Sequence, residues 1–316
     1  MIRKFTLSLF FSLVFLALLS SCKKFEGGQS VPSYIRIDSI GLTCDYSTYG
    51  SHTCKFVDAW VYLDGNPLGC FELPSTFPVL KEGPHKVAVY PGIARDGIKS
   101  IRTMYPFTAP AEYPELNLVK DSIVTLYPVV QYYPNGDNLH VRWKEDFDKG
   151  TITIQPTSQS DVGIVAVGGP IGSAEYPYAW HDAEGHSLKS GKVTLTSDTL
   201  AFCIANQEEF RDLPTTGTAC MLEMDYKCSD TIDVGLFYVD GAVTQTSILR
   251  LRPTGASGVE PMEWKKIYIN LGPYLVDYKD SEYFKIYVSS WYNRNDGPQY
   301  FYFDNMKLIY LDNYNL

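Results

Sequence analysis

The stretch that decides the fold is CMLEMDYKC, residues Cys220–Cys228. Within it Cys220, Leu222, Met224 and Tyr226 alternate with Met221, Glu223, Asp225 and Lys227. A period of two is typical of a β-strand, because successive side chains of a strand point to opposite faces of the sheet. The two cysteines at its ends stand roughly 26 Å apart in an extended strand, so they cannot form a disulfide unless the run bends back.

The same period recurs through the second half of the chain. Three further sets of residues each share a face: Ile267, Ile269 and Leu271; Phe284, Ile286 and Val288; and Met306, Leu308 and Tyr310. Gly, Pro, Asn and Asp separate these short runs, which is typical of β-sandwiches. Only residues 206–213 and 274–279 favour a helical turn, and neither shows sustained helical periodicity.

The first half carries strand signals joined by hairpin turns. An alternating run covers residues 34–40, and a second run at 58–63 reaches the turn Asp64-Gly65-Asn66 before continuing at 67–71. Asp-Gly between apolar runs is a strong hairpin signal, because glycine adopts positive φ at little cost. Residues 77–90 repeat the scheme around a Lys-Glu-Gly-Pro turn, and residues 116–130 supply two more predicted strands.

Length and composition divide the chain in two. The 316 residues exceed what one hydrophobic core usually serves. The composition turns acidic at Trp143–Gly150, and we place the domain boundary just before it. The sequence therefore predicts an all-β protein with two β-sandwich domains, over residues 32–140 and 143–316.

The N-terminus predicts a processing signal. Arg3 and Lys4 precede an apolar run at residues 5–19, which is too short to span a bilayer comfortably. Leu19-Ser20-Ser21-Cys22 follows it. This arrangement resembles a bacterial lipoprotein signal peptide with its lipobox. The resemblance implies removal of residues 1–21 and lipidation of Cys22 with diacylglycerol and an acyl chain such as palmitate, which would anchor the protein to a membrane. Residues 22–31 then form a lipidated, flexible tether.

The net charge limits the class of binding partner, and the cysteine content limits the number of disulfides. The formal net charge of −9 opposes binding to the anionic backbone of nucleic acid, so we predict no nucleic-acid partner. Beyond Cys22 there are three cysteines in each half, which allows at most one disulfide per half. Cys44 and Cys54 flank a polar loop and could meet across a hairpin, and this pairing stays open.

Two segments carry family resemblances. Residues 58–90, with Leu63-Asp64-Gly65 and Leu80–Val87, resemble the PEGA-type β-sandwiches of bacterial envelope proteins, which implies an Ig-like spacer or contact domain. Residues 147–150, 264–271 and 302–308 resemble the galactose-binding-like jelly rolls of many carbohydrate-binding modules. That resemblance implies a jelly roll over the second domain, which serves either sugar binding or a structural role.

The jelly-roll resemblance also implies a cofactor. Acidic residues at the positions of Asp148 and Asp304 often help to bind a structural calcium ion in such modules, and carboxylates are ligands that Ca²⁺ prefers. Turn or surface roles for both residues remain open. The loop His181–His186 holds four further potential ligands, but its spacing matches no zinc motif, so a solvated loop is the better interpretation.

Aromatic residues make up 14% of the chain and gather in two loops. The first runs from Tyr176 to Trp180 and includes Tyr178, and the second holds Trp291, Tyr292 and Arg294. Exposed rings beside Asn, Asp and Arg suit a sugar platform, and Tyr, Trp and Arg equally suit a protein interface. A third interpretation is that the rings cap the core.

The predicted function follows from the predicted cellular location and the predicted fold. No nucleophile elbow, phosphate loop or paired-carboxylate motif is evident, so we predict that the chain is not an enzyme. The whole pattern resembles surface lipoproteins of Bacteroidota. It implies a cell-surface, outer-membrane lipoprotein that acts as an accessory or scaffold subunit of a β-barrel machine, with the barrel or other envelope lipoproteins as partners. The alternative is a glycan-binding lipoprotein of a polysaccharide-uptake system, and a lipid-tethered hydrolase is a third, weaker one.

Overall fold

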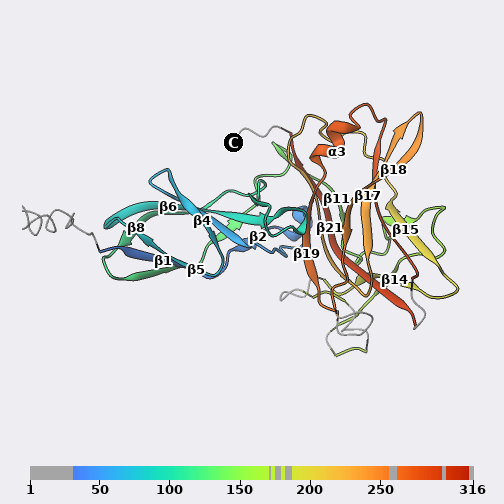
Figure 1. Cartoon of the computed structure of the whole chain (residues 1–316), viewed down its shortest axis with the longest axis horizontal. Coiled ribbons are helices and arrows are strands. Elements are labelled where there is room, and N and C mark those ends of the chain that lie inside the picture. Colours follow the sequence, from blue (N-terminus) through green and yellow to red (C-terminus); the bar gives the residue numbers. More distant parts are fainter. Residues whose placement is uncertain are drawn as a thin grey trace, which may run out of the picture.

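The computed structural model describes residues 31–170, 172–174, 179–181, 187–255, 262–293 and 297–312. These residues are almost entirely β-structure in several sheets, which confirms the predicted fold class (Figure 1). The predicted signal peptide, Cys22 and nearly all of the predicted tether lie outside the described residues. No helix within the described ranges has the length and apolar character needed to span a membrane.

The first sandwich spans residues 33–131. One sheet has the order β5-β1-β9, a second has β4-β3-β6-β7 with β8 also pairing β6, and β2 pairs β10. Their bounds are β1 (Ser33–Ile37), β2 (Gly41–Thr43), β3 (Asp58–Leu63), β4 (Asn66–Glu72), β5 (Ser75–Val79), β6 (Gly83–Ala94), β7 (Arg102–Met104), β8 (Ala111–Leu118), β9 (Ile123–Leu126) and β10 (Val129–Gln131). The short helices α2 (Tyr46–Tyr49) and η2 (Arg95–Gly97) lie between strands.

The predicted turns position these strands. Asp64 and Gly65 have positive φ values of 50° and 79° and join β3 to β4, as the Asp-Gly signal predicts. The second predicted hairpin is not formed: β5 pairs with β1 in one sheet, whereas β6 pairs with β3 in the other. The chain crosses between the sheets there, because Phe77 and Val79 of β5 are buried in the core that the two sheets share.

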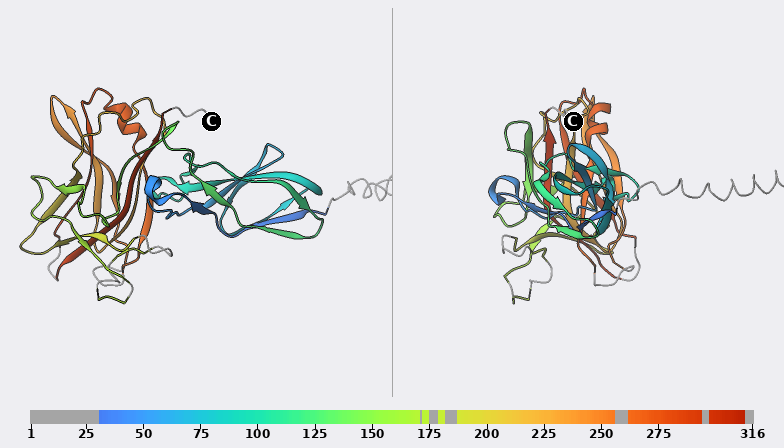
Figure 2. Two further views of the ribbon diagram at one scale, coloured as in Figure 1. Left: turned by 180° about the vertical axis from the view of Figure 1, so that it is seen from behind. Right: turned by 90° about the vertical axis from the view of Figure 1, so that its left-hand side faces the viewer.

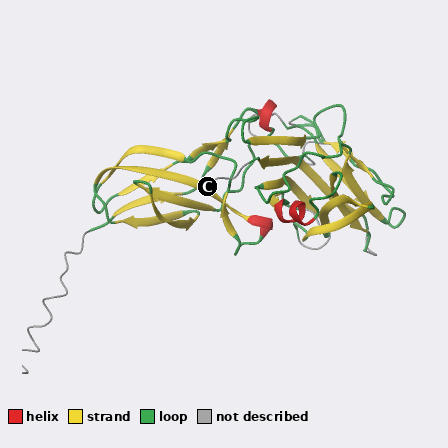
Figure 3. Cartoon of the chain, turned by 90° about the horizontal axis from the view of Figure 1, so that it is seen from above, coloured by secondary structure: helices red, strands yellow, loops and turns green. Residues whose placement is uncertain are grey.

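The second sandwich consists of two facing sheets and begins at Leu139, so that its first strand crosses the predicted boundary. The first sheet has the order β13-β14-β21-β16-β19, with β11 also pairing β21, and the second has β12-β15-β20-β17-β18. Their bounds are β11 (Leu139–Glu145), β12 (Ile154–Pro156), β13 (Val165–Val167), β14 (Ser190–Leu195), β15 (Ala201–Asn206), β16 (Cys220–Cys228), β17 (Ile232–Asp240), β18 (Ala242–Leu251), β19 (Lys265–Asn270), β20 (Phe284–Trp291) and β21 (Gln299–Leu311). Helix α3 (Gly272–Asp277) is the one short α-helix of its described residues. Figure 3 shows the helices as small segments beside two strand-rich bodies.

Strand β16 is buried along its whole length. Its apolar positions face the core between the two sheets, as the alternation predicts. Its other face does not meet water, because Met221 belongs to the core of the first sandwich and Glu223 and Asp225 are almost fully buried beside it. The two sandwiches therefore meet on the outer face of this sheet, end to face (Figures 1 and 2).

A buried polar network fills this junction. Tyr105 of the first sandwich donates a hydrogen bond to Glu223, and Lys307 Nζ donates to the Tyr132 hydroxyl at 3.0 Å. Lys266 Nζ lies 3.8 Å from a carboxylate oxygen of Glu223 and 3.8 Å from one of Asp225. Buried charges of this kind are tolerated only when opposite charges and hydrogen bonds compensate them, and here side chains from both sandwiches supply that compensation.

The six described cysteines are free thiols. Cys44 donates to the Gly50 carbonyl at 3.4 Å, and Cys54 donates to the Ile40 carbonyl at 3.9 Å. The disulfide that the sequence left open between them is not formed.

Candidate functional site

The candidate site is a groove on the outer face of the sheet β12-β15-β20-β17-β18. In β20 the residues Phe284, Ile286 and Val288 point into the core. The alternate residues, Lys285 among them, therefore point away from it. The neighbouring strands add Ala205 from β15 and Phe237 from β17, which lie opposite Tyr287 and Lys285 respectively.

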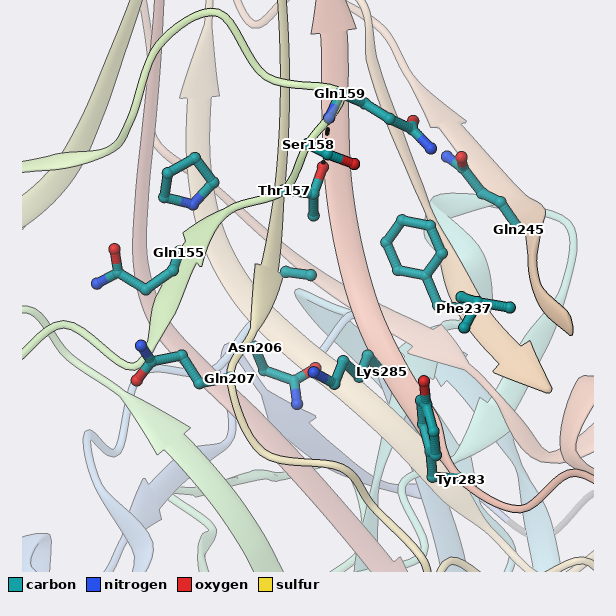
Figure 4. A pocket seen from close by; sticks show the side chains of 13 residues that line it. Gln155, Thr157, Ser158, Gln159, Asn206, Gln207, Phe237, Gln245, Tyr283 and Lys285 are labelled. Atoms are coloured by element: carbon teal, nitrogen blue, oxygen red, sulfur yellow. Dashed lines mark hydrogen bonds between the residues drawn. The ribbon is translucent and has the colours of Figure 1, made fainter.

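The groove has a volume of about 670 Å³, and its walls are rich in amides. It is lined by Gln155, Pro156, Thr157, Ser158, Gln159, Ala205, Asn206, Gln207, Phe237, Val243, Gln245, Tyr283 and Lys285. Phe237 and Ala205 are buried and form an apolar floor, whereas Gln159, Gln207 and Gln245 are exposed. Figure 4 shows Gln159 and Gln245 facing each other across the groove near Phe237.

Backbone hydrogen bonds fix one wall. The segment 157–161 runs along β15, where Thr157 N–H donates to the Cys203 carbonyl at 2.9 Å and Asp161 N–H donates to the Ala201 carbonyl at 2.9 Å. The Asp161 carboxylate in turn accepts from the Leu200 and Ala201 N–H groups at 2.8 and 2.9 Å. Gln159 is therefore presented from a pinned loop, which lowers the entropy cost of binding a ligand there.

A buried asparagine fixes the end of β15 on the same side of the groove. Asn206 accepts a hydrogen bond from Ile286 N–H at 2.6 Å and donates to the Glu208 carbonyl. This contact ties the end of β15 to β20 and leaves the next residue, Gln207, exposed at the rim. Within the described part of the chain, the side chains of Gln159 and Gln207 make no hydrogen bond to other residues, so their amides are available to a ligand.

The same sheet face continues beyond the groove. Tyr287 lies across Gly235, where a Cβ atom would come within 2.5 Å of its hydroxyl oxygen. That hydroxyl donates to Asp233 at 3.1 Å, and Ser247 donates to the same carboxylate at 2.6 Å. Burial raises the pKa of Tyr287 to about 12, so it remains a donor at neutral pH. These contacts hold the Tyr287 ring in place over Gly235, so that the middle of the sheet face is covered and has no cavity at this point.

Trp291 lies on this face, at the end of β20. The residue is 50% exposed, and the Arg250 guanidinium lies 5.4 Å from the ring centroid. Tyr292, the next residue, turns the other way and packs against the core, with its hydroxyl donating to the Gly297 carbonyl at 3.1 Å. The two neighbours, which the sequence placed in one loop, therefore have different surroundings. Arg294 lies outside the described residues.

Trp180 belongs to a different place. Its N–H donates to the Ser190 hydroxyl at 2.8 Å and its carbonyl accepts from Ser187 at 3.3 Å, which ties it to the start of β14 in the other sheet. Tyr178 and His186 lie outside the described residues. The structure thus separates Trp180 from Trp291, and binding roles for Trp180, Tyr178, Tyr292 and Arg294 stay predictions.

Asp148 and Asp304 lie on either side of the segment 187–190. Asp148 accepts from the Leu188 and Lys189 N–H groups, both at 3.0 Å, and Asp304 accepts from the Ser190 hydroxyl at 2.6 Å. Burial raises the pKa of both carboxyl groups, that of Asp304 well above its usual range. Among the described residues no group of three His, Cys, Asp or Glu side chains could hold a metal ion. Protein donors already occupy both carboxylates, and structural calcium at this pair stays a prediction.

The groove itself was not predicted from the sequence. Its lining residues come from strands that are far apart in the chain, so no local cluster announces them. Two features of the sequence could have indicated the groove. One is the pair Lys285 and Tyr287, which alternate with the apolar residues of the predicted strand 284–288, and the other is the set of glutamines around residues 155, 207 and 245. Only the order of the strands in the sheet shows that these residues lie side by side.

No protein-family model matches the sequence, and no curated protein matches it. Several solved structures share part of the architecture. One is a carbohydrate-binding module of the β-sandwich superfamily, with 14% identity, a TM-score of 0.36 and coverage of 80% of this chain and 85% of that one.

Two further structures cover about half of this chain. TmCBM61, solved with β-1,4-galactotriose, has 15% identity, a TM-score of 0.30 and coverage of 52% and 89%. The family 11 carbohydrate-binding module of the cellulase Lic26A-Cel5E of Clostridium thermocellum has 14% identity, a TM-score of 0.31 and coverage of 52% and 94%. Likenesses at these scores assign no family and no ligand, so the function rests on the chemistry of the groove.

Proposed function

We propose that the chain is a non-catalytic glycan-binding protein whose site is the groove on the sheet β12-β15-β20-β17-β18. The observation that carries the proposal is the chemistry of the lining. An apolar floor of Phe237 and Ala205 suits the C–H face of a sugar ring, and the surrounding amides both donate and accept hydrogen bonds, as sugar hydroxyls require.

Binding is favoured over hydrolysis at this groove. Glycoside hydrolysis needs two carboxyl groups roughly 5 to 10 Å apart at the scissile bond. The residues that line the groove include no Asp or Glu. The lining therefore supplies recognition groups without the acid and base that cleavage requires.

The test is binding of residues 31–316 to a panel of soluble polysaccharides, measured by affinity electrophoresis and isothermal titration calorimetry. We expect at least one glycan to bind, and Gln207→Ala and Gln245→Ala each to weaken it about fivefold to tenfold through the loss of a hydrogen bond. Gln131→Ala, an exposed position on the first sandwich, is the matched control. Wild-type binding by both groove variants, or no binding to any glycan, would overturn the proposal.

The predicted scaffold function is kept as a second candidate because one surface favours it. Four apolar side chains on the segment 119–129 are exposed: Val119, Ile123, Tyr127 and Val129. Ile123 is 61% exposed on β9, at the edge of its sheet among the described strands. Open apolar edges are pairing sites for other chains, and the predicted partner is an outer-membrane β-barrel or another envelope lipoprotein. Ile123→Lys should abolish copurification with such a barrel in mild detergent, and unchanged copurification would remove this candidate.

Attachment to the outer membrane belongs to the same proposal and rests on the sequence. Cys22→Ala should release the protein from membranes or leave it unprocessed, because the acyl chains are the proposed anchor. A mature-sized variant that still sediments with membranes would show that protein contacts suffice.

A further inference from the structure

Lys285 places a positive charge in the groove. It is half-buried at the base of β20, and its nearest ring partner is Tyr283, whose centroid lies 5.9 Å from Nζ. Over the described residues Lys285 makes no salt bridge. No residue that lines the groove is acidic, so the lining carries one positive charge although the chain as a whole is acidic.

The acidic residues next to the groove form ion pairs with two arginines. Glu209 and Glu282 each pair with Arg211, at 2.5 and 2.6 Å. Glu208 and Asp212 share Arg142 in the same way, at 2.6 and 2.8 Å. The four carboxylates share two arginines, and none of them pairs with Lys285, which leaves the charge of Lys285 to a ligand.

A second cation lies farther along the same face. Arg250 stands beside Trp291, and its Nε is 3.8 Å from Asp233, whose carboxylate also accepts hydrogen bonds from Ser247 and Tyr287. Lys285 and Trp291 are six residues apart on β20, which is roughly 20 Å along the strand. A chain-like ligand that follows β20 from the groove would meet Lys285 first and the Trp291–Arg250 pair last.

We infer that the groove takes an acidic glycan, a polymer whose sugars carry carboxylate or sulfate groups, and that Lys285 contacts one anionic group. The inference rests on the proposed function and names its substrate class. The amides bind hydroxyl groups that neutral and acidic sugars share, whereas Lys285 selects for the negative charge. Trp291 supplies a stacking surface at the far end, beside the Arg250 guanidinium.

The test compares polymers that differ only in charge. Polygalacturonate is measured against its methyl-esterified form, and a sulfated galactan against its desulfated form. We expect wild-type residues 31–316 to bind an acidic member at least tenfold more tightly than its neutral counterpart, with affinity falling as salt rises. Lys285→Gln should lose about fivefold to tenfold for the acidic polymer and little for the neutral one.

Lys279→Gln is the matched control, because it removes the same charge from an exposed position of the same sandwich outside the groove. Equal wild-type affinity for charged and neutral members, or equal losses for the two lysine variants, would overturn the inference while glycan binding itself stood. Absence of binding to these polymers and to every glycan of the wider panel would instead overturn the proposed function. The two polymer pairs separate a carboxylate from a sulfate ligand.

Discussion

Burial sets the chemistry of Asp304. Its carboxyl group has no exposed surface, and burial holds its pKa well above the usual range. The folded protein therefore retains a proton that the unfolded chain releases above the ordinary aspartate pKa of 3.8. The free energy of unfolding then falls as pH rises from that value toward the folded-state pKa. Without a bound cation, this residue opposes folding at neutral pH.

Asp304→Asn should consequently raise the melting temperature at pH 7 in EDTA, and the gain should shrink as pH falls toward 4. A change of about 1 kcal/mol corresponds to about 2–4 °C for a sandwich of this size. Asp198→Asn, at an exposed position, is the control. If the pair Asp148 and Asp304 holds calcium, added Ca²⁺ raises the wild-type melting temperature and Asp304→Asn abolishes that rise. A lower melting temperature for Asp304→Asn in EDTA would contradict the argument from burial.

Trp291 and Tyr292 show how one residue step divides surface from core. Trp291→Ala should change the free energy of unfolding by less than about 1 kcal/mol, because half of its side chain is exposed. Tyr292→Ala should cost about 2 kcal/mol, because its ring packs against the core. Urea denaturation of the two single variants checks this, and equal costs would contradict it. Only the Trp291 variant should also lose glycan affinity while its stability is retained.

At the scale of elements, local pattern predicted most strands and little of their pairing. The alternation in Cys220–Cys228 and the turn at Asp64-Gly65 are local, and both are confirmed. The partner of a strand is chosen by distant residues, so β5 was wrongly placed in a hairpin with β6. The groove was missed for the same reason, since its glutamines meet only after five strands have been ordered. The outward position of Trp291, in contrast, follows from its place in β20.

Strand β21 carries Lys307 into the junction, where burial lowers its pKa to about 8. Glu223, Lys266, Cys44 and Lys144 also act on it. The unfolded chain binds this proton up to about pH 10.5, so between pH 8 and 10.5 the unfolded state holds more protons. The free energy of unfolding therefore rises with pH over that window.

Lys307→Met lacks this titration. The variant and the wild type can differ in free energy of unfolding at pH 7 in either direction. As pH rises from 8 to 10.5, the wild type should gain stability relative to Lys307→Met, as measured by urea denaturation at each pH. A constant difference across the window would show that Lys307 titrates normally and that the junction is open to water.

At the scale of the whole molecule, the junction couples two sandwiches that the sequence treats as separate folding units. Met221, Tyr268 and Ile309 of the second sandwich belong to the hydrophobic core of the first. Alternation along a strand reports that a face is polar or apolar, and it does not report which neighbour covers that face. The extent of this contact was therefore not predictable from the alternation that places Glu223 and Asp225 on one face of the strand.

A fragment of residues 137–316 should unfold at a lower temperature than the same sandwich in the full chain, because separation exposes these apolar side chains and the buried ions to water. Differential scanning calorimetry of both proteins measures the shift. Identical midpoints would mean that the sandwiches are independent, as the sequence-based division at residues 140–143 predicts, and limited proteolysis should then cut within residues 135–149.

The end-to-face arrangement has a consequence for many copies acting together. Strand β1 begins at the end of the first sandwich that is remote from the second (Figures 1 and 2), and the buried junction holds the second sandwich in place. If the lipid attaches at Cys22, each molecule is a rigid pair of sandwiches on a short tether, with its groove held away from the bilayer. Neighbouring molecules then bind one long polymer simultaneously. Their high effective concentration on the membrane raises the overall avidity far above the affinity of a single groove.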